Sequence, residues 1–194
     1  MTVSSSDQLA SQALAFAVQC HAGRRRESDG APFITHPLEV AGLLRDAGCS
    51  ETVIAAGLLH DVVEAAEIGL RELAERFGDD VAALVAAVTD DTCVESYRRR
   101  KQMLRDHVRF VDGDAALLLA AAKISAVRDW PRRAGRHRAR LDDVPADSRA
   151  RRVLDNHHAL RLEHFRASLA MLQELAPQHR LVHQLEEALR RCAA

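Results

Sequence analysis

Aromatic residues, prolines and long apolar runs are scarce in this chain, and each scarcity excludes a class of protein. Aromatics make up 4% of the 194 residues and there are five prolines. No alternating run of β-branched residues is long enough to predict a strand. The longest apolar runs, VIAAGLL and AALLLAAA, are far too short to cross a bilayer. We therefore expect a helical protein with no membrane-spanning segment.

The sequence also has no excess of one charge and no cysteine pattern. Its 27 Lys and Arg residues against 28 Asp and Glu residues give a net charge of −1, which argues against general binding to nucleic acid. The four cysteines include no CxxC pair and suit reduced thiols better than a disulfide framework. No basic region followed by an apolar stretch opens the chain, so we expect no signal peptide and a cytoplasmic location.

Helical periodicity runs through nearly the whole sequence. Pro37 stands where a first-turn proline belongs, and Gly48 closes the same predicted helix. Ser50 is the predicted N-cap of the next helix. The pattern predicts an all-α protein with one domain over residues 1–194, a bundle of about eight to nine helices.

A basic segment interrupts this pattern. Residues 131–140, PRRAGRHRAR, hold five arginines. An acidic stretch follows them, and prolines at 131 and 145 stand near the two ends of the combined segment. We expect residues 131–146 to form a loop. The acidic residues can neutralise the arginines, which favours a solvated surface loop over a lid that draws in a phosphorylated ligand.

One predicted helix, apolar over most of its length, carries three polar residues close together: His60, Asp61 and Glu64 in GLLHDVVE. Adjacent helix positions diverge by about 100°, so His60 and Asp61 converge only on a group at the helix edge. A metal ion is such a group, because it binds imidazole nitrogen and carboxylate oxygen together. Glu64 follows one turn after His60, where a carboxylate can handle an attacking water. For an isolated pair, a hydrogen-bonded polar cluster in the core is the more common alternative.

Two more histidines are candidates for the same site. His36 in ITHP precedes a proline, which disfavours helix, so we expect it in a turn and free to point at another element. An exposed position at a helix start is its simpler explanation. His21, near a helix end, is expected to pack behind the ligands or to be structural.

These motifs follow one another in a specific order: HAGRRRESDGAPFITHPLEVAGLL, AAGLLHDVVE, ERFGDDVAALVAAVTDD and YRRRKQ. In that order the chain resembles the HD-domain hydrolases of the RelA/SpoT type, especially the small stand-alone alarmone hydrolases, over about residues 8–130. The resemblance implies an all-helical HD fold that binds one divalent metal, typically Mn²⁺. Members remove the 3′-pyrophosphate from guanosine tetra- or pentaphosphate (ppGpp or pppGpp), and some act as NADPH phosphatases.

The resemblance also assigns roles by position. His36, His60 and Asp61 match three metal ligands, and Glu64 matches a carboxylate that handles the attacking water. Guanidinium groups stack on bases and bind phosphates in bidentate fashion, and the basic residues that match the nucleotide contacts are Arg25, Arg26, Arg100 and Lys101.

Three positions depart from the family pattern. The fourth metal ligand, the Asp of a KLAD stretch, corresponds to Ala126 in KISA, with about four residues lost before VRDW. Asp129 is a possible substitute ligand, although a capping carboxylate is its simpler role. Ala65 replaces the second member of a Glu–Asp pair, and Glu27 stands where a phosphate-facing cation is expected.

Two functions remain open on the sequence. The first is a metal-dependent phosphohydrolase that acts on a nucleotide such as ppGpp or on a related phosphorylated metabolite, and the retained ligands favour it. The second is a degenerate pseudo-hydrolase that binds a nucleotide or a protein partner with little turnover, which Ala65 and Ala126 favour. Neither involves nucleic acid or a membrane, and a homo-oligomer remains possible.

Overall fold

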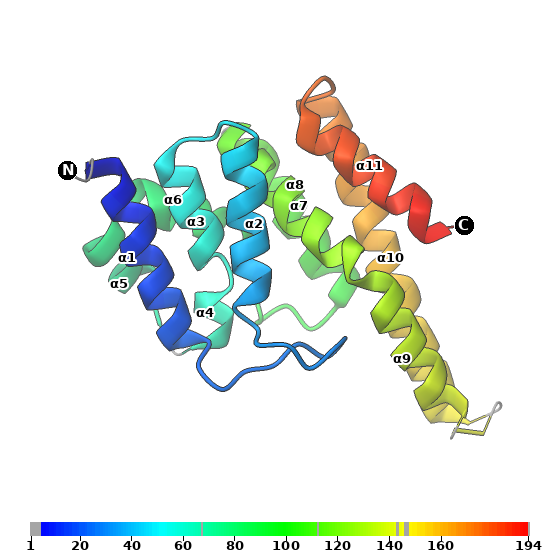
Figure 1. The fold of residues 1–194 in the computed structure, drawn as a ribbon. Coiled ribbons are helices and arrows are strands. Elements are labelled where there is room, and N and C mark those ends of the chain that lie inside the picture. Colours follow the sequence, from blue (N-terminus) through cyan, green and yellow to red (C-terminus); the bar gives the residue numbers. More distant parts are fainter. Residues whose placement is uncertain (1–4, 67, 112, 143, 146–147, 194) are drawn as a thin grey trace.

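The computed structural model describes residues 5–66, 68–111, 113–142, 144–145 and 148–193, and over these ranges the prediction of an all-α fold is confirmed (Figure 1). None of the described helices is both long and apolar enough to span a membrane. The helices are α1 Ser5–Cys20, α2 Thr35–Asp46, α3 Glu51–Leu59, α4 Val62–Ala65, α5 Leu70–Phe77, α6 Asp79–Val88, α7 Tyr97–Phe110, α8 Gly113–Arg128, α9 Trp130–Asp142, α10 Arg149–Leu175 and α11 Arg180–Ala193.

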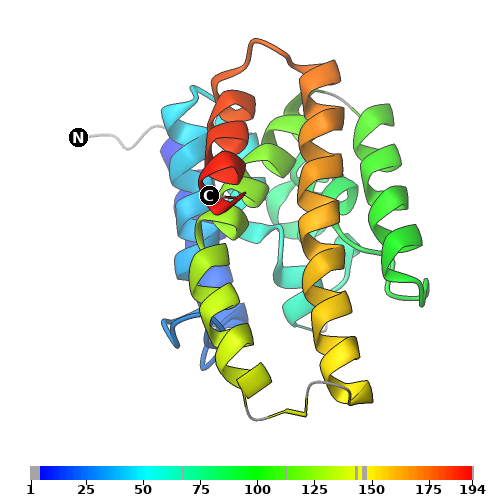
Figure 2. The same ribbon diagram turned by 90° about the vertical axis from the view of Figure 1, so that its right-hand side faces the viewer.

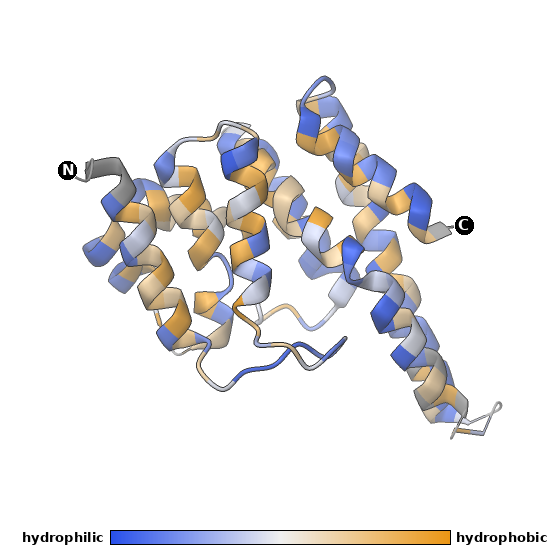
Figure 3. Cartoon of the chain, viewed as in Figure 1, coloured by the Kyte–Doolittle hydropathy of each residue, from blue (hydrophilic) through white to orange (hydrophobic). Residues whose placement is uncertain are grey.

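Helix α3 lies at the centre of the bundle. The Oγ of Ser50 accepts a hydrogen bond from the backbone N–H of Val53 and caps the helix, as predicted. Every residue from Val53 to Leu59 is buried, and α1, α2, α6 and α8 pack around them. Figure 3 shows α3 mainly in the hydrophobic colours, as expected of a helix that is apolar on all sides. The C-terminal end of α3, where His60 follows, is therefore held inside the protein.

A close contact between α2 and α3 depends on Gly57. A Cβ at this position would lie 2.6 Å from Cδ1 of Leu44 and 3.4 Å from Cγ1 of Val40. Both of these side chains are fully buried. Glycine is the residue that leaves room for the two helices to approach here. The contact brings the start of α2, with His36, to the end of α3.

The basic segment is helical, so the prediction of a loop is wrong over residues 131–142, which belong to α9 Trp130–Asp142; residues 143 and 146 of the predicted loop lie outside the described residues. Pro131 is the second residue of α9, in the first turn, where a missing N–H costs little, and the Ala and Arg residues that follow are good helix formers. Trp130 and Leu141 are buried at its two ends. Together with the first half of α10, α9 forms a hairpin that extends from the body (Figures 1 and 2).

Gly57→Val tests the contact between α2 and α3. We expect it to lower the free energy of unfolding by about 1–3 kcal/mol, because the added carbons overpack a filled core. Urea denaturation followed by circular dichroism measures the change. Gly42→Ala is the matched control, because a Cβ on this α2 glycine meets no atom within 4 Å, and it should stabilise the helix by up to about 1 kcal/mol. A Gly57→Val protein as stable as wild type would show that the close approach does not constrain the fold.

Candidate metal centre and substrate pocket

The predicted helix that carries the His–Asp pair is interrupted at the pair itself. α3 ends at Leu59 and α4 begins at Val62, with Asp61 between them at φ −101° and ψ −3°. The expectation of one continuous helix, with Glu64 on the same face one turn after His60, is therefore wrong. The interruption has a chemical consequence, since adjacent side chains that would diverge on a regular helix can here point to one place.

Three side chains converge at this point. The Nε2 of His60 lies 3.2 Å from the Nε2 of His36 and 3.4 Å from Oδ1 of Asp61. The Nε2 of His36 lies 3.5 Å from Oδ2 of Asp61. Ligands bound at about 2.0–2.2 Å around one metal ion lie roughly 3–3.5 Å apart, so the spacing fits a shared ion. Among the described residues, this is the one group of three or more His, Cys, Asp or Glu side chains close enough to hold a metal.

A hydrogen bond orients the ring of His60. Its Nδ1 lies 2.8 Å from the carbonyl oxygen of Gly57. A carbonyl oxygen only accepts, so Nδ1 carries the proton and Nε2 presents its lone pair to Asp61. The residue that lets α2 approach α3 therefore also sets the tautomer of His60.

A second relay orients His36. Its Nδ1 lies 2.8 Å from Oγ of Ser125 on α8, and Ser125 lies 2.7 Å from Oε2 of Glu39, which accepts its proton. Ser125 must then accept from Nδ1 of His36. Both histidines thus turn an unprotonated Nε2 toward the carboxylate of Asp61. The two lone pairs and the carboxylate repel one another, and a cation bound between them would stabilise the group. Such partners behind the ligands are usual at metal sites, and the donor set fits a divalent metal.

The charge states at neutral pH suit the same role. Burial lowers the pKa of His36 to about 4, although Asp61 acts in the opposite direction, so the imidazole is neutral and able to bind a metal. Burial acts to raise the pKa of Asp61, but the neighbouring His60, His36, His21 and Lys123 together hold it below its ordinary value. The carboxylate is therefore ionised.

Glu64 lies outside the group of three, exposed on α4. Its Oε1 accepts a hydrogen bond from the backbone N–H of Asp90 at 3.2 Å. The carboxylate of Asp90 in turn pairs with Lys101 and, at 3.4 Å, with Arg100. The predicted substrate contacts on α7 are thus connected to Glu64 through Asp90. They do not line the pocket in front of His36.

That pocket has a volume of about 200 Å³ and opens onto His36 and Asp61. Of the two arginines predicted in the basic run, only Arg26 lines it. Arg25 instead donates from Nη1 to the carbonyl oxygen of Gly30 at 2.9 Å. The remaining lining residues are aromatic, basic, acidic or small: Phe33, Ser125, Ala126, Asp129, Arg133, Arg161 and Phe165.

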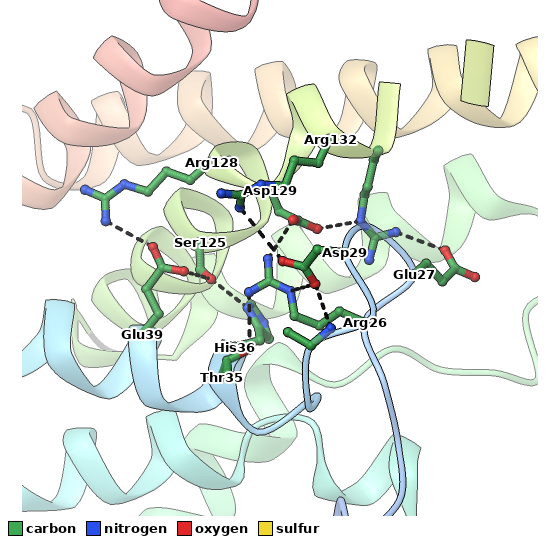
Figure 4. Close-up of polar contacts among 12 residues, drawn as sticks. Arg26, Glu27, Asp29, Thr35, His36, Glu39, Ser125, Arg128, Asp129 and Arg132 are labelled. Carbon is green, nitrogen blue, oxygen red and sulfur yellow. Dashed lines mark hydrogen bonds and ion pairs between the residues drawn. The ribbon is translucent and has the colours of Figure 1, made fainter. Parts of the chain in front are cut away.

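Asp129 is held in this pocket by two arginines (Figure 4). Its Oδ1 lies 2.7 Å from Nη2 of Arg26 and its Oδ2 lies 3.1 Å from Nε of Arg133. Burial acts to raise its pKa, but hydrogen bonds from Ser28 and Arg133, together with the charge of Arg26, hold it below the ordinary value. The structure thus places Asp129 in an ion-paired cluster and outside the group of three. Ala126 lines the pocket and offers no ligand atom.

Several residues that lie at the site were not predicted from the sequence. Ser125 and Lys123 lie in KISA, a stretch considered only for its lost Asp. Two polar residues within an apolar helix were a usable signal. Lys123 is a half-buried lysine whose pKa burial lowers to about 8. Arg133 lay in a predicted loop and Arg161 in a helix with no other sign of function.

Comparisons with known proteins agree with this arrangement. A model of the HD domain family matches residues 13–128. A Synechocystis protein named as a probable guanosine-3′,5′-bis(diphosphate) 3′-pyrophosphohydrolase is 51% identical over 78 residues, 40% of this chain and 10% of that protein. The guanosine-3′,5′-bis(diphosphate) 3′-pyrophosphohydrolase of Xenopus tropicalis is 37% identical over 134 residues, 67% of this chain and 74% of the relative. The chain thus spans only a tenth of the Synechocystis protein.

The fold has a solved counterpart. A structure described as a metazoan ortholog of SpoT that hydrolyses ppGpp superposes with a TM-score of 0.73 at 24% identity, covering 99% of this chain and 98% of that one. At this identity the likeness concerns the fold alone. With the family match over residues 13–128 and the Xenopus relative, the chain belongs to the HD-domain family, in its RelA/SpoT-type branch.

Proposed function

We propose that the protein is a metal-dependent phosphohydrolase that removes the 3′-pyrophosphate of ppGpp or of a related nucleotide, with Mn²⁺ as its metal. The observation that carries this proposal is the convergence of Nε2 of His36, Nε2 of His60 and the carboxylate of Asp61. The Xenopus relative has this activity by name. A nucleotide substrate and four free thiols suit the cytoplasm, where we place the protein.

The residues divide the chemistry among them. A divalent cation held by the group of three supplies Lewis acidity, which polarises a phosphoryl oxygen and makes water a better nucleophile. Glu64, exposed and outside the ligand group, is the carboxylate that can take the proton of the attacking water. Arg26 on the pocket wall binds the anionic substrate, and Asp129 holds its guanidinium in place. Phe33 and Phe165 provide apolar surface for a base.

The second candidate is a nucleotide-binding pseudo-hydrolase, favoured by two missing carboxylates. Ala126 faces the pocket where the resemblance places a fourth ligand, and Ala65 ends α4 directly after Glu64. With fewer carboxylates, the site attracts a cation less and an anionic ligand more. Binding without turnover follows if the metal is lost.

Metal binding is the first test. We expect purified protein to bind one Mn²⁺ per chain by calorimetry, and saturating Mn²⁺ to raise the melting temperature, because the ion binds only the folded state. His60→Ala should abolish binding, since it leaves two protein ligands.

His179→Ala provides the matched control, because His179 lies between α10 and α11, outside the ligand group, and the variant should bind as wild type does. If the wild-type protein binds no Mn, Zn, Fe, Ni or Co, then His36, His60 and Asp61 are a polar core cluster and the proposal fails.

Asp129→Asn separates an ion-paired role from a ligand role. We expect Mn²⁺ affinity to stay within about threefold of wild type, while the melting temperature falls because Arg26 and Arg133 lose their buried counter-charge. The folded-state pKa of Asp129 lies below its unfolded value, so this stabilisation is present above about pH 4 and is lost as the pH falls further. The melting temperatures of the two proteins should therefore converge in acid. A large loss of Mn²⁺ affinity would instead make Asp129 the fourth ligand.

Turnover is expected to be slow. With Ala65 and Ala126 in place of carboxylates, release of pyrophosphate from ppGpp in excess Mn²⁺ should be weak or undetectable, since the loss of one general acid–base group costs a factor of about 10²–10⁴. Glu64→Gln should remove any remaining activity. Turnover equal to that of an intact family member, and lost in Glu64→Gln, would mean that the missing carboxylates are dispensable.

A complementary experiment restores the two missing carboxylates and looks for a gain of activity. The double change Ala65→Asp and Ala126→Asp should raise both Mn²⁺ affinity and turnover. Ala122 is buried one turn earlier on α8, on the same side of the helix as Ala126. Ala65→Asp with Ala122→Asp is therefore the second arm, and it tells which turn of α8 can deliver the ligand.

A further inference from the structure

A pocket of about 250 Å³ lies between the α8–α9 junction and α11, on the side of α8 that faces away from His36. Val127 lines it and stands two positions after Ser125, which contacts His36, and side chains two positions apart on a helix diverge by about 200°. Helix α11 packs against α8 (Figure 1). The family match ends at residue 128, before α11 begins, so the metal centre does not account for this pocket.

Two residues of this pocket carry hydrogen-bond acceptors with little or no use inside the protein. In a continuous helix the carbonyl oxygen of Val127 would accept from the N–H of residue 131, but Pro131 has none. The Sγ of Cys192 on α11 donates to this oxygen instead, at 3.4 Å, and a thiol is a weak donor. The Oε1 of Gln184 is buried with no hydrogen-bond partner among the described residues. The pocket therefore favours a ligand that brings a stronger donor.

Arg128 gives the same pocket a positive charge and connects it to the metal centre. Its Nη1 donates to Oε1 of Glu39 at 3.1 Å. The other oxygen of Glu39 accepts from Ser125, which contacts Nδ1 of His36. The side chain of Arg128 is 48% exposed, so its other N–H groups can bind a carboxylate. Arg128 thus belongs both to the pocket and to the polar contacts behind His36.

The remaining lining residues define the size and charge of the ligand. Pro131 and Ala188 contribute apolar surface. Arg191 and Glu187 lie one turn apart on α11 and pair with each other, so their charges offset one another. Arg128 is then the cation that can anchor an anion. The pocket suits a small anion with an apolar body.

We propose that this pocket is a regulatory site for a small hydroxy acid with an apolar body. Its carboxylate pairs with Arg128, its hydroxyl donates to the carbonyl oxygen of Val127 or to the amide of Gln184, and its apolar body packs on Pro131 and Ala188. A hydroxyl supplies the donor without adding a second positive charge beside Arg128.

The ligand acts on the metal centre through charge. When Arg128 pairs with a carboxylate, its positive charge offsets that of Glu39 less, and the environment of His36 becomes more negative. A more negative environment makes the imidazole a better ligand for a cation. Mn²⁺ and the hydroxy acid should each strengthen the binding of the other by one common factor, because coupling between two sites is reciprocal. This regulatory role rests on the proposed function.

The pocket is tested first without metal, by a ¹H–¹⁵N NMR titration with 2-hydroxy-4-methylpentanoate. We expect millimolar binding with shifts on α8 and α11. Two matched probes, 4-methylpentanoate without the hydroxyl and 2-hydroxy-4-methylpentanamide without the charge, should each bind about 10-fold more weakly, the worth of one hydrogen bond or one partly buried charge pair.

Three variants locate the probe. Arg128→Gln should weaken the carboxylate about 10-fold and leave the amide unchanged, and Ala188→Leu, which fills the pocket, should weaken all three probes. Arg190→Gln is the matched control, because Arg190 is exposed on α11 outside the pocket, and it should bind as wild type does. Thermal melting shows whether each variant is folded. Arg128 is half exposed, so Arg128→Gln decides the matter if Ala188→Leu does not fold.

The second arm measures Mn²⁺ affinity with and without saturating 2-hydroxy-4-methylpentanoate. We expect the probe to tighten Mn²⁺ binding about 3- to 10-fold in wild type and to have no effect in Arg128→Gln. No binding of the probe at millimolar concentration, or binding that survives both Arg128→Gln and Ala188→Leu, overturns the site even if the protein binds Mn²⁺ and hydrolyses ppGpp. Binding in the pocket with unchanged Mn²⁺ affinity overturns the regulatory role. If the protein binds no metal, the proposed function and the regulatory role both fail, while the metal-free titration still decides whether the pocket binds the hydroxy acid.

Discussion

The site depends on one hydrogen bond, from Nδ1 of His60 to the carbonyl oxygen of Gly57. That bond leaves the Nε2 lone pair of His60 facing His36 and Asp61, and the missing side chain of Gly57 lets α2 bring His36 within 3.2 Å. Gly57 thus determines both the packing of α2 against α3 and the orientation of the His60 ring. A larger residue at position 57 would separate α2 from α3, and the separation would move one ligand away from the other two.

α8 provides the second support, through contacts behind His36. Ser125 accepts from the imidazole and donates to Glu39, and Glu39 also accepts from Nη1 of Arg128 at 3.1 Å. This chain of polar contacts ends in a charged pair near the surface (Figure 4). Because the hydroxyl of Ser125 donates to Glu39, it accepts from Nδ1 of His36 and leaves Nε2 of His36 unprotonated, the tautomer that a metal ligand needs. Although Ala126 offers no ligand atom, α8 still orients His36 through the hydroxyl of Ser125.

The sequence was enough to predict an all-α fold and the three residues that converge, because helix period and motif order are local signals. It was not enough to predict the break between α3 and α4, since an apolar run with His60 in it keeps helical periodicity across the turn. It also predicted the wrong structure for residues 131–142, where two prolines and many charges suggested a loop. What makes α9 a helix is tertiary packing: Trp130 and Leu141 are buried, and Arg133 pairs with Glu27, a partner 106 residues away in sequence.

The departures from the family pattern are connected through charge. Under the proposed function, Ala65 and Ala126 stand where the family has carboxylates and so lower the negative charge near the proposed cation site, while Glu27 adds negative charge to the loop beside Arg26. Arg133 of α9 then compensates Glu27, and among the described residues no carboxylate pairs with Arg136 of α9 or with Arg161 of α10. Since opposite charges at close range interact by several kcal/mol at an effective dielectric of about 20, such a redistribution weakens attraction for the metal and strengthens attraction for phosphate. Whether the protein acts as a hydrolase or as a pseudo-hydrolase therefore depends on how tightly His36, His60 and Asp61 alone bind the metal ion in this electrostatic environment.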